Sequence, residues 1–293
     1  ATKAQDHIFP AYREHAIGMI RGIDVLDIIR VLRGVTHGGW DPTDPANKNF
    51  HIYTLVIGSQ ALHSTGYGMG INFDGATNTG NPDTDQAVIV YFGDGATSQG
   101  DVSEAFVFAA SYQTPQVFFV QNNHWAISVP VSTQSKVPLY QRAAGFGLPG
   151  IQVDGNDVFA SYAVTAKQLD DARSGKGPSM IEALTYRIGA HTSSDDPTKY
   201  RKDEELEKWI ARDPIHRLES FLKGKGAEQK FFDEVHDEAA EFAADIRRRT
   251  LEIENPEPGS MFDHVYSEPH PLVAEQKAWL ATYEASFDEG GAE

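Results

Sequence analysis

Two apolar runs that stop abruptly at small, oxygen-bearing residues constrain the fold of this chain most. The first run, Ala87–Phe92, leads into Gly-Asp-Gly-Ala, and the second, Gln116–Gln121, leads into Asn-Asn-His-Trp. About 30 positions separate Asp94 from Asn123, which is room for one helix between two parallel strands. The carboxyl ends of neighbouring parallel strands meet at one edge of a sheet, where such folds bind ligands. The pattern therefore predicts a carboxylate and a carboxamide at that edge.

The same alternation of strand and helix continues along the chain. A helix is predicted between the two runs, a second helix from Asp157 to about Ala172, and a further strand over Met180–Tyr186. Helices that connect parallel strands cover both faces of the sheet. We predict one α/β domain over residues 1–293, with a doubly wound parallel sheet in residues 1–202 and a charged, helical C-terminal region in residues 203–293.

Other segments carry local predictions. Ile17–Leu32 follows a loosely helical period, and Leu55–Ile71 is predicted as a Gly-rich helix whose backbone permits close approach of another segment or subunit. Residues 36–49, rich in Gly, Pro, Asp and Asn, are predicted as a loop. Ser98 and Asp101 have the spacing of a capping box for the helix that follows them.

Composition and charge exclude several classes of function. The chain has 42 acidic and 25 basic residues and a formal net charge of −17, which repels the phosphate backbone of nucleic acids. No apolar run has the length of a membrane span, so we expect neither a nucleic-acid partner nor a membrane partner. The absence of cysteine excludes disulfides and thiol catalysis and favours a cytoplasmic location.

The polar turns after the two runs suit a divalent cation that carries a diphosphate. Asp94 offers a carboxylate, Asn123 a carboxamide, and Trp125 a backbone carbonyl. Magnesium prefers such hard oxygen ligands and takes further ones from phosphates, and the glycines beside Asp94 let backbone N–H groups approach an anion. Each turn taken alone also fits a simpler interpretation, an Asp-capped strand-to-helix turn or an ordinary Asn turn. Their joint spacing favours the metal site.

Four segments, in order along the chain, resemble one known family. They are GDGATSQGD, VQNNHWAISVPVS, VDGNDVFA and EALTYRIGAHTSSDDPTKYR. The resemblance extends from Phe9 to about Tyr266 and is to the alpha subunit of the thiamine-diphosphate-dependent decarboxylating component of 2-oxo acid dehydrogenase complexes, of branched-chain or pyruvate type. It implies the thiamine-diphosphate-binding fold, with thiamine diphosphate and Mg²⁺ as cofactors. Members of the family carry a further helical segment before Phe9, so we expect a processed form or a piece of a longer chain.

The resemblance also assigns cofactor residues. Tyr12 and Arg13 match a pair that contacts the cofactor diphosphate, and Ile57 matches an apolar position beside the cofactor. The diphosphate and magnesium loops correspond to Gly93, Asp94, Gly95, Ala96, Gln121, Asn123 and Trp125, of which Asp94, Asn123 and the Trp125 carbonyl hold Mg²⁺. Gln121 stands where some relatives have Arg, which removes one positive charge. Some relatives bind K⁺ near the residues that match Thr54, Val56, Ser59 and Gln60.

His191 is the predicted catalytic residue. It follows the strand Met180–Tyr186, and a histidine can donate or accept a proton near neutral pH. The resemblance implies that it lies by the thiazolium and assists reductive transfer of the acyl group to lipoate; a hydrogen-bonded loop histidine is the simpler alternative. Among the other histidines only His63 is a further candidate. A network that orders the loop over the cofactor is expected from Asp195, Asp196, Tyr200 and Arg201; a mobile acidic loop is the alternative.

Half of the expected active site is missing from the sequence. Thiamine chemistry needs a carboxylate near the aminopyrimidine, and we find no convincing glutamate for it; in the family a beta subunit supplies it. The resemblance implies an alpha2beta2 heterotetramer that decarboxylates a 2-oxo acid and acylates the lipoyl domain of a transacylase. The spacing after His191 favours a branched-chain substrate of the 3-methyl-2-oxobutanoate type, with pyruvate second and acetoin third. A non-catalytic binding or regulatory module that keeps the fold is the alternative from another class.

Overall fold

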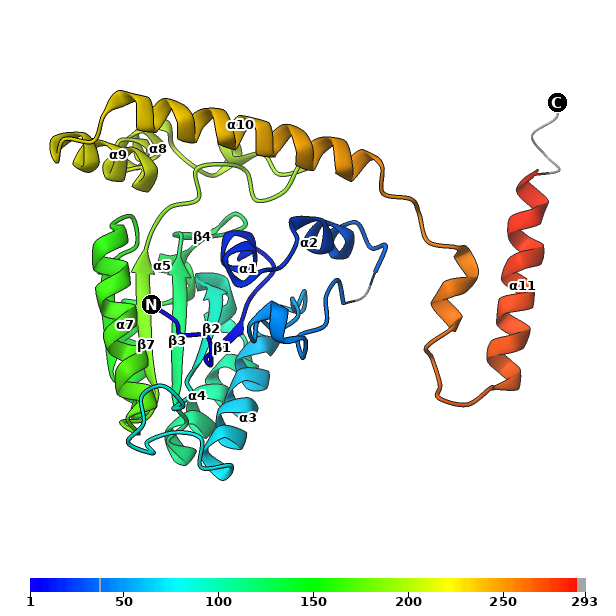
Figure 1. Ribbon diagram of the computed structural model, residues 1–293, viewed down its shortest axis with the longest axis horizontal. Helices are drawn as coiled ribbons and strands as arrows, with labels where there is room; N and C mark the ends of the chain where they lie inside the picture. The colour runs from blue at the N-terminus through cyan, green and yellow to red at the C-terminus, as the bar shows by residue number, and fades with distance from the viewer. Residues whose placement is uncertain (37, 289–293) are drawn as a thin grey trace.

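A parallel β-sheet forms the centre of the protein in the computed structural model, which describes residues 1–36 and 38–288 (Figure 1). Its strands lie in the order β1-β2-β3-β7-β6, and every neighbouring pair is parallel. They are β1 (His7–Phe9), β2 (Val88–Gly93), β3 (Gln116–Asn122), β6 (Gly150–Asp154) and β7 (Ser179–Leu184). A small antiparallel hairpin follows β3 and consists of β4 (Trp125–Ala126) and β5 (Val129–Pro130). The predicted parallel sheet is confirmed.

Helices connect the strands and then continue alone along the C-terminal part. In the sheet region they are α1 (His15–Arg21), α2 (Val25–Leu32), α3 (Ser59–Phe73), α4 (Gly100–Tyr112), α5 (Val131–Gln134), α6 (Leu139–Gly145) and α7 (Val158–Arg173). After Lys202 they are α8 (Asp203–Ile210), α9 (Pro214–Gly224), α10 (Gln229–Leu251) and α11 (Pro271–Asp288). Short 3₁₀ helices are η1 (Pro45–Asn47), η2 (Asp94–Ser98), η3 (Pro197–Lys199) and η4 (Pro258–Phe262). Asp157 caps α7, as predicted, by accepting from the backbone N–H of Phe159 and Ala160 at 3.0 Å each.

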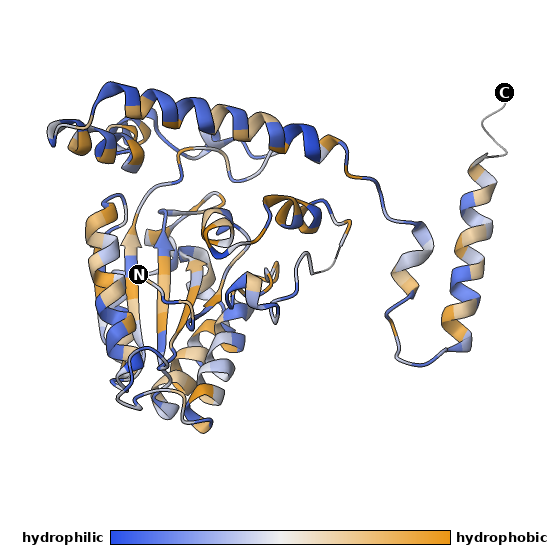
Figure 2. Cartoon of the chain, in the orientation of Figure 1, coloured by the Kyte–Doolittle hydropathy of each residue, from blue (hydrophilic) through white to orange (hydrophobic). Residues whose placement is uncertain are grey.

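Two hydrophobic cores lie on opposite faces of the sheet. Along β2, Val88, Val90 and Phe92 belong to a core shared with α3, α4 and α6, whereas Ile89 and Tyr91 belong to a core shared with α2 and α7. Successive side chains of a strand point to opposite faces, so a strand covered on both faces must be apolar throughout. Figure 2 shows the strands as largely apolar and α10 as a mixture of apolar and hydrophilic residues. The predicted doubly wound arrangement is confirmed.

Several local predictions differ from the structure. The edge strand β1 was not predicted, because three residues are too few to show a period. The first predicted helix is two helices, since α1 ends at Gly22, whose φ of 102° suits glycine. The Gly-rich helix α3 begins at Ser59 rather than Leu55. The capping box was wrong: Ser98 lies inside η2, and α4 begins at Gly100 without a side-chain cap.

The C-terminal region is helical, as predicted. Helix α10 contacts α2, while α11 packs on η4 and stands away from the sheet in Figure 1. On α11 the rings of Trp279 and Tyr283 stack at 5.3 Å and remain exposed. None of the helices in the described residues is both long and apolar enough to cross a membrane. The division into a 1–202 core and a 203–293 region stays a prediction, and residues 289–293 lie outside the described part.

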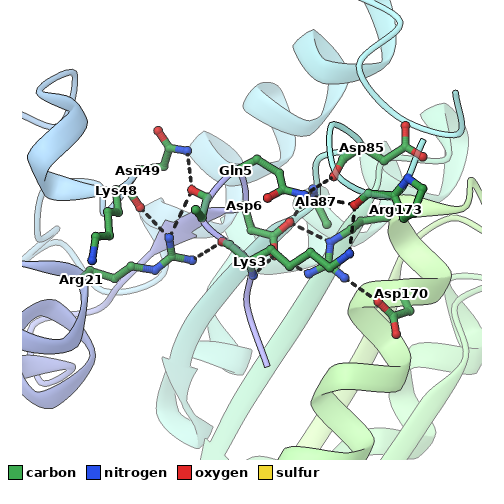
Figure 3. Close-up of polar contacts among 12 residues, drawn as sticks. Lys3, Gln5, Asp6, Arg21, Lys48, Asn49, Asp85, Ala87, Asp170 and Arg173 are labelled. Carbon is green, nitrogen blue, oxygen red and sulfur yellow. Dashed lines mark hydrogen bonds and ion pairs between the residues drawn. The ribbon is translucent and has the colours of Figure 1, made fainter. Parts of the chain in front are cut away.

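A buried ion pair holds the N-terminal segment at the amino end of the sheet (Figure 3). Arg173, at the end of α7, donates from Nε to Asp6 Oδ1 at 2.9 Å and from Nη2 to Asp6 Oδ2. The same carboxylate accepts from the backbone N–H of Ala87 at 3.2 Å and of Lys3 at 2.6 Å. Arg21 adds bonds to the backbone carbonyls of Lys3 and Lys48, at 2.8 Å each. The segment before β1 is thereby joined to the end of α7, to the start of β2 and to α1.

We expect Asp6→Ala to lower the free energy of unfolding by about 3–5 kcal/mol, because it removes the buried partner of the Arg173 guanidinium and leaves only the exposed Asp170 paired with it. The matched control is Arg30→Ala, which removes an exposed ion pair with Asp27 and should cost less than about 1 kcal/mol. Urea unfolding followed by circular dichroism measures both. Equal midpoints for the two variants would contradict the assignment.

A pair of histidines packs beside β1. His7 Nδ1 and His51 Nε2 lie 3.1 Å apart, and the His51 ring stacks on Phe9 with centroids 3.9 Å apart. Burial lowers the pKa of each ring to about 4, and the neighbouring His7 adds to the lowering at His51. Both rings are therefore neutral in the folded protein at physiological pH.

This pair predicts a loss of stability in acid. In the unfolded chain both rings take up protons near the ordinary histidine pKa of about 6.5, whereas in the folded state they do so only near pH 4. The folded state therefore loses stability as the pH falls from about 6.5 towards 4. A His7→Gln/His51→Gln double variant should show a weaker decline of the unfolding free energy over this range, whereas the exposed His236→Gln control should follow the unsubstituted chain. Parallel declines in the double variant and the control would refute the role of the pair.

Candidate active site

A cavity of about 340 Å³ opens at the carboxyl ends of β2 and β3. The residues that line it include the predicted Tyr12, Arg13, Thr54, Ile57, Gln60, Gly93, Asp94, Gly95, Ala96, Gln121, Asn123, Trp125 and His191. Gly93 of β2 is paired with Gln121 of β3, so the two strands end at the same level. Segments far apart in the sequence are thus brought to one site, at the sheet edge where the strand pattern predicted a ligand. Of the predicted residues, Val56 and Ser59 do not line the cavity, and neither does His63, which is exposed on α3.

Asp94 begins η2 directly after β2 and is only 1% exposed. Burial raises the pKa of its carboxyl group, and a hydrogen bond from Gln134 opposes this effect. In that bond the Nε2 of Gln134 donates to Asp94 Oδ2 at 3.1 Å. A Cβ added to Gly95 would lie 2.9 Å from the Cβ of Ala126, so only glycine lets this loop pack so closely on the β4–β5 hairpin.

The second loop supplies two further oxygens. Asn123 Oδ1 accepts from the backbone N–H of Trp125 at 3.1 Å, which turns the chain sharply, and His124 between them has a φ of 73°. The carbonyl of Trp125 accepts from Arg187 Nη1 at 3.0 Å. Amide and carbonyl oxygens have two lone pairs, so each keeps acceptor capacity after these bonds. Together with the carboxylate of Asp94 they form an all-oxygen donor set of the kind that Mg²⁺ binds.

Other residues that line the cavity suit an anion. Arg13 follows β1, is exposed to the cavity, and donates from Nη2 to the carbonyl of His191 at 2.9 Å. Its guanidinium lies 5.1 Å from the Tyr12 ring centroid. No heavy atom lies within 4 Å of the point where a Cβ on Gly93 would stand, so the backbone is open there. Guanidinium and free backbone N–H groups are the donors that bind phosphate.

Two buried oxygens in the cavity wall have no hydrogen-bond partner within the described residues. They are Glu14 Oε2 and Gln60 Oε1, in side chains that are 4% and 3% exposed. Gln60 uses its Nε2 to donate to the carbonyl of Tyr91 at 3.0 Å, which leaves its oxygen free. Burial raises the pKa of the Glu14 carboxyl group. Glu14 was not predicted, although its position directly after the Tyr12-Arg13 pair was a usable signal.

His191 is held at the cavity mouth by a network centred on Arg187. Its backbone N–H donates to Asp195 Oδ2 at 2.7 Å, and the hydroxyl of Tyr200 donates to the same oxygen at 2.6 Å. Arg187 in turn donates to Tyr200 at 2.6 Å and to the carbonyls of Trp125 and Ile127. Burial, together with the charges of Arg13 and Arg187, lowers the pKa of the His191 imidazole. The ring is therefore neutral at physiological pH.

Hydrogen bonds of the predicted loop network are present, with one addition, whereas its ordering of the loop over the cofactor stays a prediction. Arg201 donates to the carbonyls of Arg187 and Ile188, and Asp196 caps η3 by accepting from the backbone N–H of Thr198. Arg187, which connects the loop to the Trp125 carbonyl, was missed, because a lone Arg after a strand carries no sequence signal of its own.

We expect Arg187→Met to loosen the loop of residues 187–201. Trypsin cleavage after Lys199 and Arg201 should accelerate about tenfold or more, because hydrogen bonds to charged groups are worth about 1.5–3 kcal/mol each. Lys208→Met, at an exposed position of α8, is the matched control and should leave the rate unchanged. The measurement is the time course of digestion followed by mass spectrometry. An unaltered rate in Arg187→Met would show that the network does not order the loop.

Comparison with known proteins agrees with this geometry. Residues 1–255 match the family model described as "Dehydrogenase E1 component". The chain is 40% identical over 285 residues to a 3-methyl-2-oxobutanoate dehydrogenase subunit alpha of Mycobacterium tuberculosis, which covers 97% of this chain and 75% of that protein. It is 35% identical over 282 residues to pyruvate dehydrogenase E1 component alpha subunits of Staphylococcus epidermidis and Staphylococcus aureus, which covers 94% of this chain and 72% of those proteins.

The chain therefore belongs to the dehydrogenase E1 component family. Within this family it is of the 2-oxo acid dehydrogenase alpha-subunit type, a thiamine-diphosphate-dependent decarboxylating oxidoreductase.

Proposed function

We propose that this chain, together with a beta subunit, decarboxylates a branched-chain 2-oxo acid of the 3-methyl-2-oxobutanoate type and passes the acyl group to lipoyl-lysine of a transacylase. The observation that carries the proposal is the cavity itself, where the oxygen donors of two loops, Arg13 and His191 converge. The substrate preference is supported by the higher identity to the mycobacterial relative, 40% against 35%. Pyruvate is the second candidate.

The cavity residues divide into a metal-binding group and an anion-binding group. Asp94, Asn123 and the Trp125 carbonyl would hold Mg²⁺, and Arg13 with the backbone of residues 93–96 would hold the diphosphate. Charge supports this division, because the buried carboxylate of Asp94 suits a cation and the guanidinium of Arg13 suits an anion. When bound, thiamine diphosphate supplies the electron sink that loss of carbon dioxide requires. The contribution of this chain is to bind and orient it.

His191 is proposed as the proton-transferring group. Its imidazole is neutral at physiological pH, so it can accept a proton, or donate one from its N–H, as acyl transfer to a dithiolane requires. Arg13 and Asp195 fix its backbone through hydrogen bonds of 2.9 and 2.7 Å, which hold the ring at the cavity mouth. A rigid backbone around a free ring is typical of a positioned acid–base group.

A beta subunit would complete the site. Glu14 is the glutamate that lines the cavity in the described residues, and it adjoins Arg13 on the anion-binding side. The carboxylate for the aminopyrimidine is therefore assigned to the partner, in an alpha2beta2 assembly. Open space at Gly66 and Gly70, on the exposed side of α3, supports close packing of another subunit there.

A second cation, K⁺, is proposed near Thr54, Val56, Ser59 and Gln60. The hydroxyl of Ser59 donates to the carbonyl of Val56 at 2.8 Å, so these two residues lie together. The unpartnered Oε1 of Gln60 is a buried oxygen suited to a monovalent cation.

The first test is cofactor binding by the reconstituted alpha and beta subunits. We expect thiamine diphosphate to bind only with Mg²⁺ present. Asp94→Ala should abolish this Mg²⁺-dependent binding, because it removes the only carboxylate of the proposed donor set. Asp101→Ala, at an exposed position of α4, is the matched control and should bind as the unsubstituted chain does. Calorimetry measures affinity, and circular dichroism confirms the fold. Failure of the reconstituted pair to bind the cofactor would favour a non-catalytic module.

The second test concerns the substrate. The reconstituted pair should decarboxylate 3-methyl-2-oxobutanoate with a kcat/KM at least about tenfold above that for pyruvate, since the extra methyl groups of the branched chain gain contact energy in a matching pocket. Release of carbon dioxide measures both rates. Acetoin, which has no carboxyl group to lose, is tested as a third substrate through release of acetaldehyde. The reverse preference would assign the chain to the pyruvate type.

A further inference from the structure

The neutral side chain of Gln134, from the segment after β3, forms a hydrogen bond with the carboxylate of Asp94, in the loop after β2. Gln134, the last residue of α5, donates from Nε2 to Asp94 Oδ2 at 3.1 Å. Within residues 1–36 and 38–288, this is the side-chain hydrogen bond recorded for that carboxylate. Gln134 therefore engages one of the two oxygens of Asp94. Burial raises the pKa of this carboxyl group, and hydrogen bonding by the backbone of Asn123, in the other loop, also opposes that effect.

The orientation of the Gln134 amide is fixed from its other end. The hydroxyl of Ser98 donates to Gln134 Oε1 at 3.2 Å. An ionised carboxylate only accepts hydrogen bonds, so the NH₂ group must face Asp94 and the oxygen must face Ser98. Ser98, which does not cap α4, thus fixes the direction of a chain of hydrogen bonds that ends on the metal-binding carboxylate.

Gln134 also joins the two loops that carry the proposed metal ligands. It belongs to the segment of Asn123 and Trp125, because the backbone N–H of Val131 at the start of α5 donates to the carbonyl of His124 at 2.9 Å. Its amide crosses from that segment to the loop after β2. The distance between the Asp94 carboxylate and the other two ligands is therefore set partly by one side chain.

The charge of the donor suits a metal ligand. An amide stabilises the carboxylate without cancelling its charge, whereas a bound cation would compete with Mg²⁺. The nearby guanidinium of Arg142 donates instead to Thr97, from Nη1 to Oγ1 at 3.1 Å and from Nη2 to the carbonyl at 3.0 Å. The positively charged Arg142 therefore stabilises the turn at Thr97, and the neutral Gln134 contacts Asp94.

We propose that Gln134 is a positioning residue for the Mg²⁺ site, which holds the Asp94 carboxylate through Oδ2 and fixes the spacing of the two loops that would bind the metal. The inference rests on the proposed function of the cavity. Hydrogen bonds that orient metal ligands from behind typically change metal affinity by about 10- to 100-fold when removed.

The experiment is a Mg²⁺ titration of the reconstituted alpha and beta subunits at a fixed, saturating concentration of thiamine diphosphate, followed by tryptophan fluorescence. In Gln134→Ala the half-saturating Mg²⁺ concentration should rise by about 10- to 100-fold. Thiamine diphosphate affinity should recover at saturating Mg²⁺, and the melting temperature in excess chelator should stay unchanged. A merely structural role would lower the melting temperature and would not be rescued by metal. Gln141→Ala, at an exposed position of α6, is the matched control.

Ser98→Ala is the second variant and should shift the half-saturating Mg²⁺ concentration in the same direction by a smaller factor, because the amide keeps its bond to Asp94 but loses its anchor. If Gln134→Ala does not fold, the Mg²⁺ titration of Ser98→Ala tests the proposal instead. If both variants keep the half-saturating Mg²⁺ concentration of the unsubstituted chain while Asp94→Ala fails to bind the cofactor, the role of Gln134 is overturned and the proposed function stands. Absence of Mg²⁺-dependent binding in the unsubstituted pair would overturn the proposed function as well.

Discussion

The parallel pairing of β2, β3 and β7 is the constraint on which the rest of the site depends. Gly93 is paired with Gln121, and Asn122 with Leu184, so the three strands end at one level. The loops that follow them carry Asp94, the Asn123–Trp125 segment and His191. Because the strands are packed on both faces, a one-residue shift of register would move each side chain into the opposite core and disrupt the packing there, so it is strongly disfavoured. The geometry of the cavity is therefore set by the hydrophobic cores rather than by the polar groups themselves.

Much of this arrangement could be predicted from the sequence because it rests on local pattern. Apolar runs of strand length, followed by Gly-Asp-Gly and Asn-Asn, indicated both the sheet and the edge at which the cavity opens. The spacing alone placed Asp94, Asn123 and Trp125 at this edge, the resemblance added Arg13 and His191, and all five line the cavity; their roles stay predictions. The loop network of Asp195, Tyr200 and Arg201 was expected because these residues lie close together in the sequence.

The residues that were missed act only through contacts between distant segments. Gln134 lies in Val-Ser-Thr-Gln, and nothing in that run indicates that its amide reaches Asp94. Ser98 was misassigned for a related reason: the capping-box spacing is a local rule, whereas its actual partner is on α5. Arg187 and Glu14 have the same character, because each gains its role from burial or from a partner on another element. Tertiary contact, rather than composition, decides such roles.

The ion pair of Asp6 and Arg173 lies at the amino end of the sheet, whereas the cavity opens at the carboxyl end. The two sets of polar groups share no hydrogen-bond partner in the described residues. Substitutions at distant sites with no shared partners usually have additive effects on stability. The amino ends of the strands therefore contribute stability, and the carboxyl ends carry the cavity. The cavity lining can vary during evolution to suit another 2-oxo acid while the anchored end preserves the folded state.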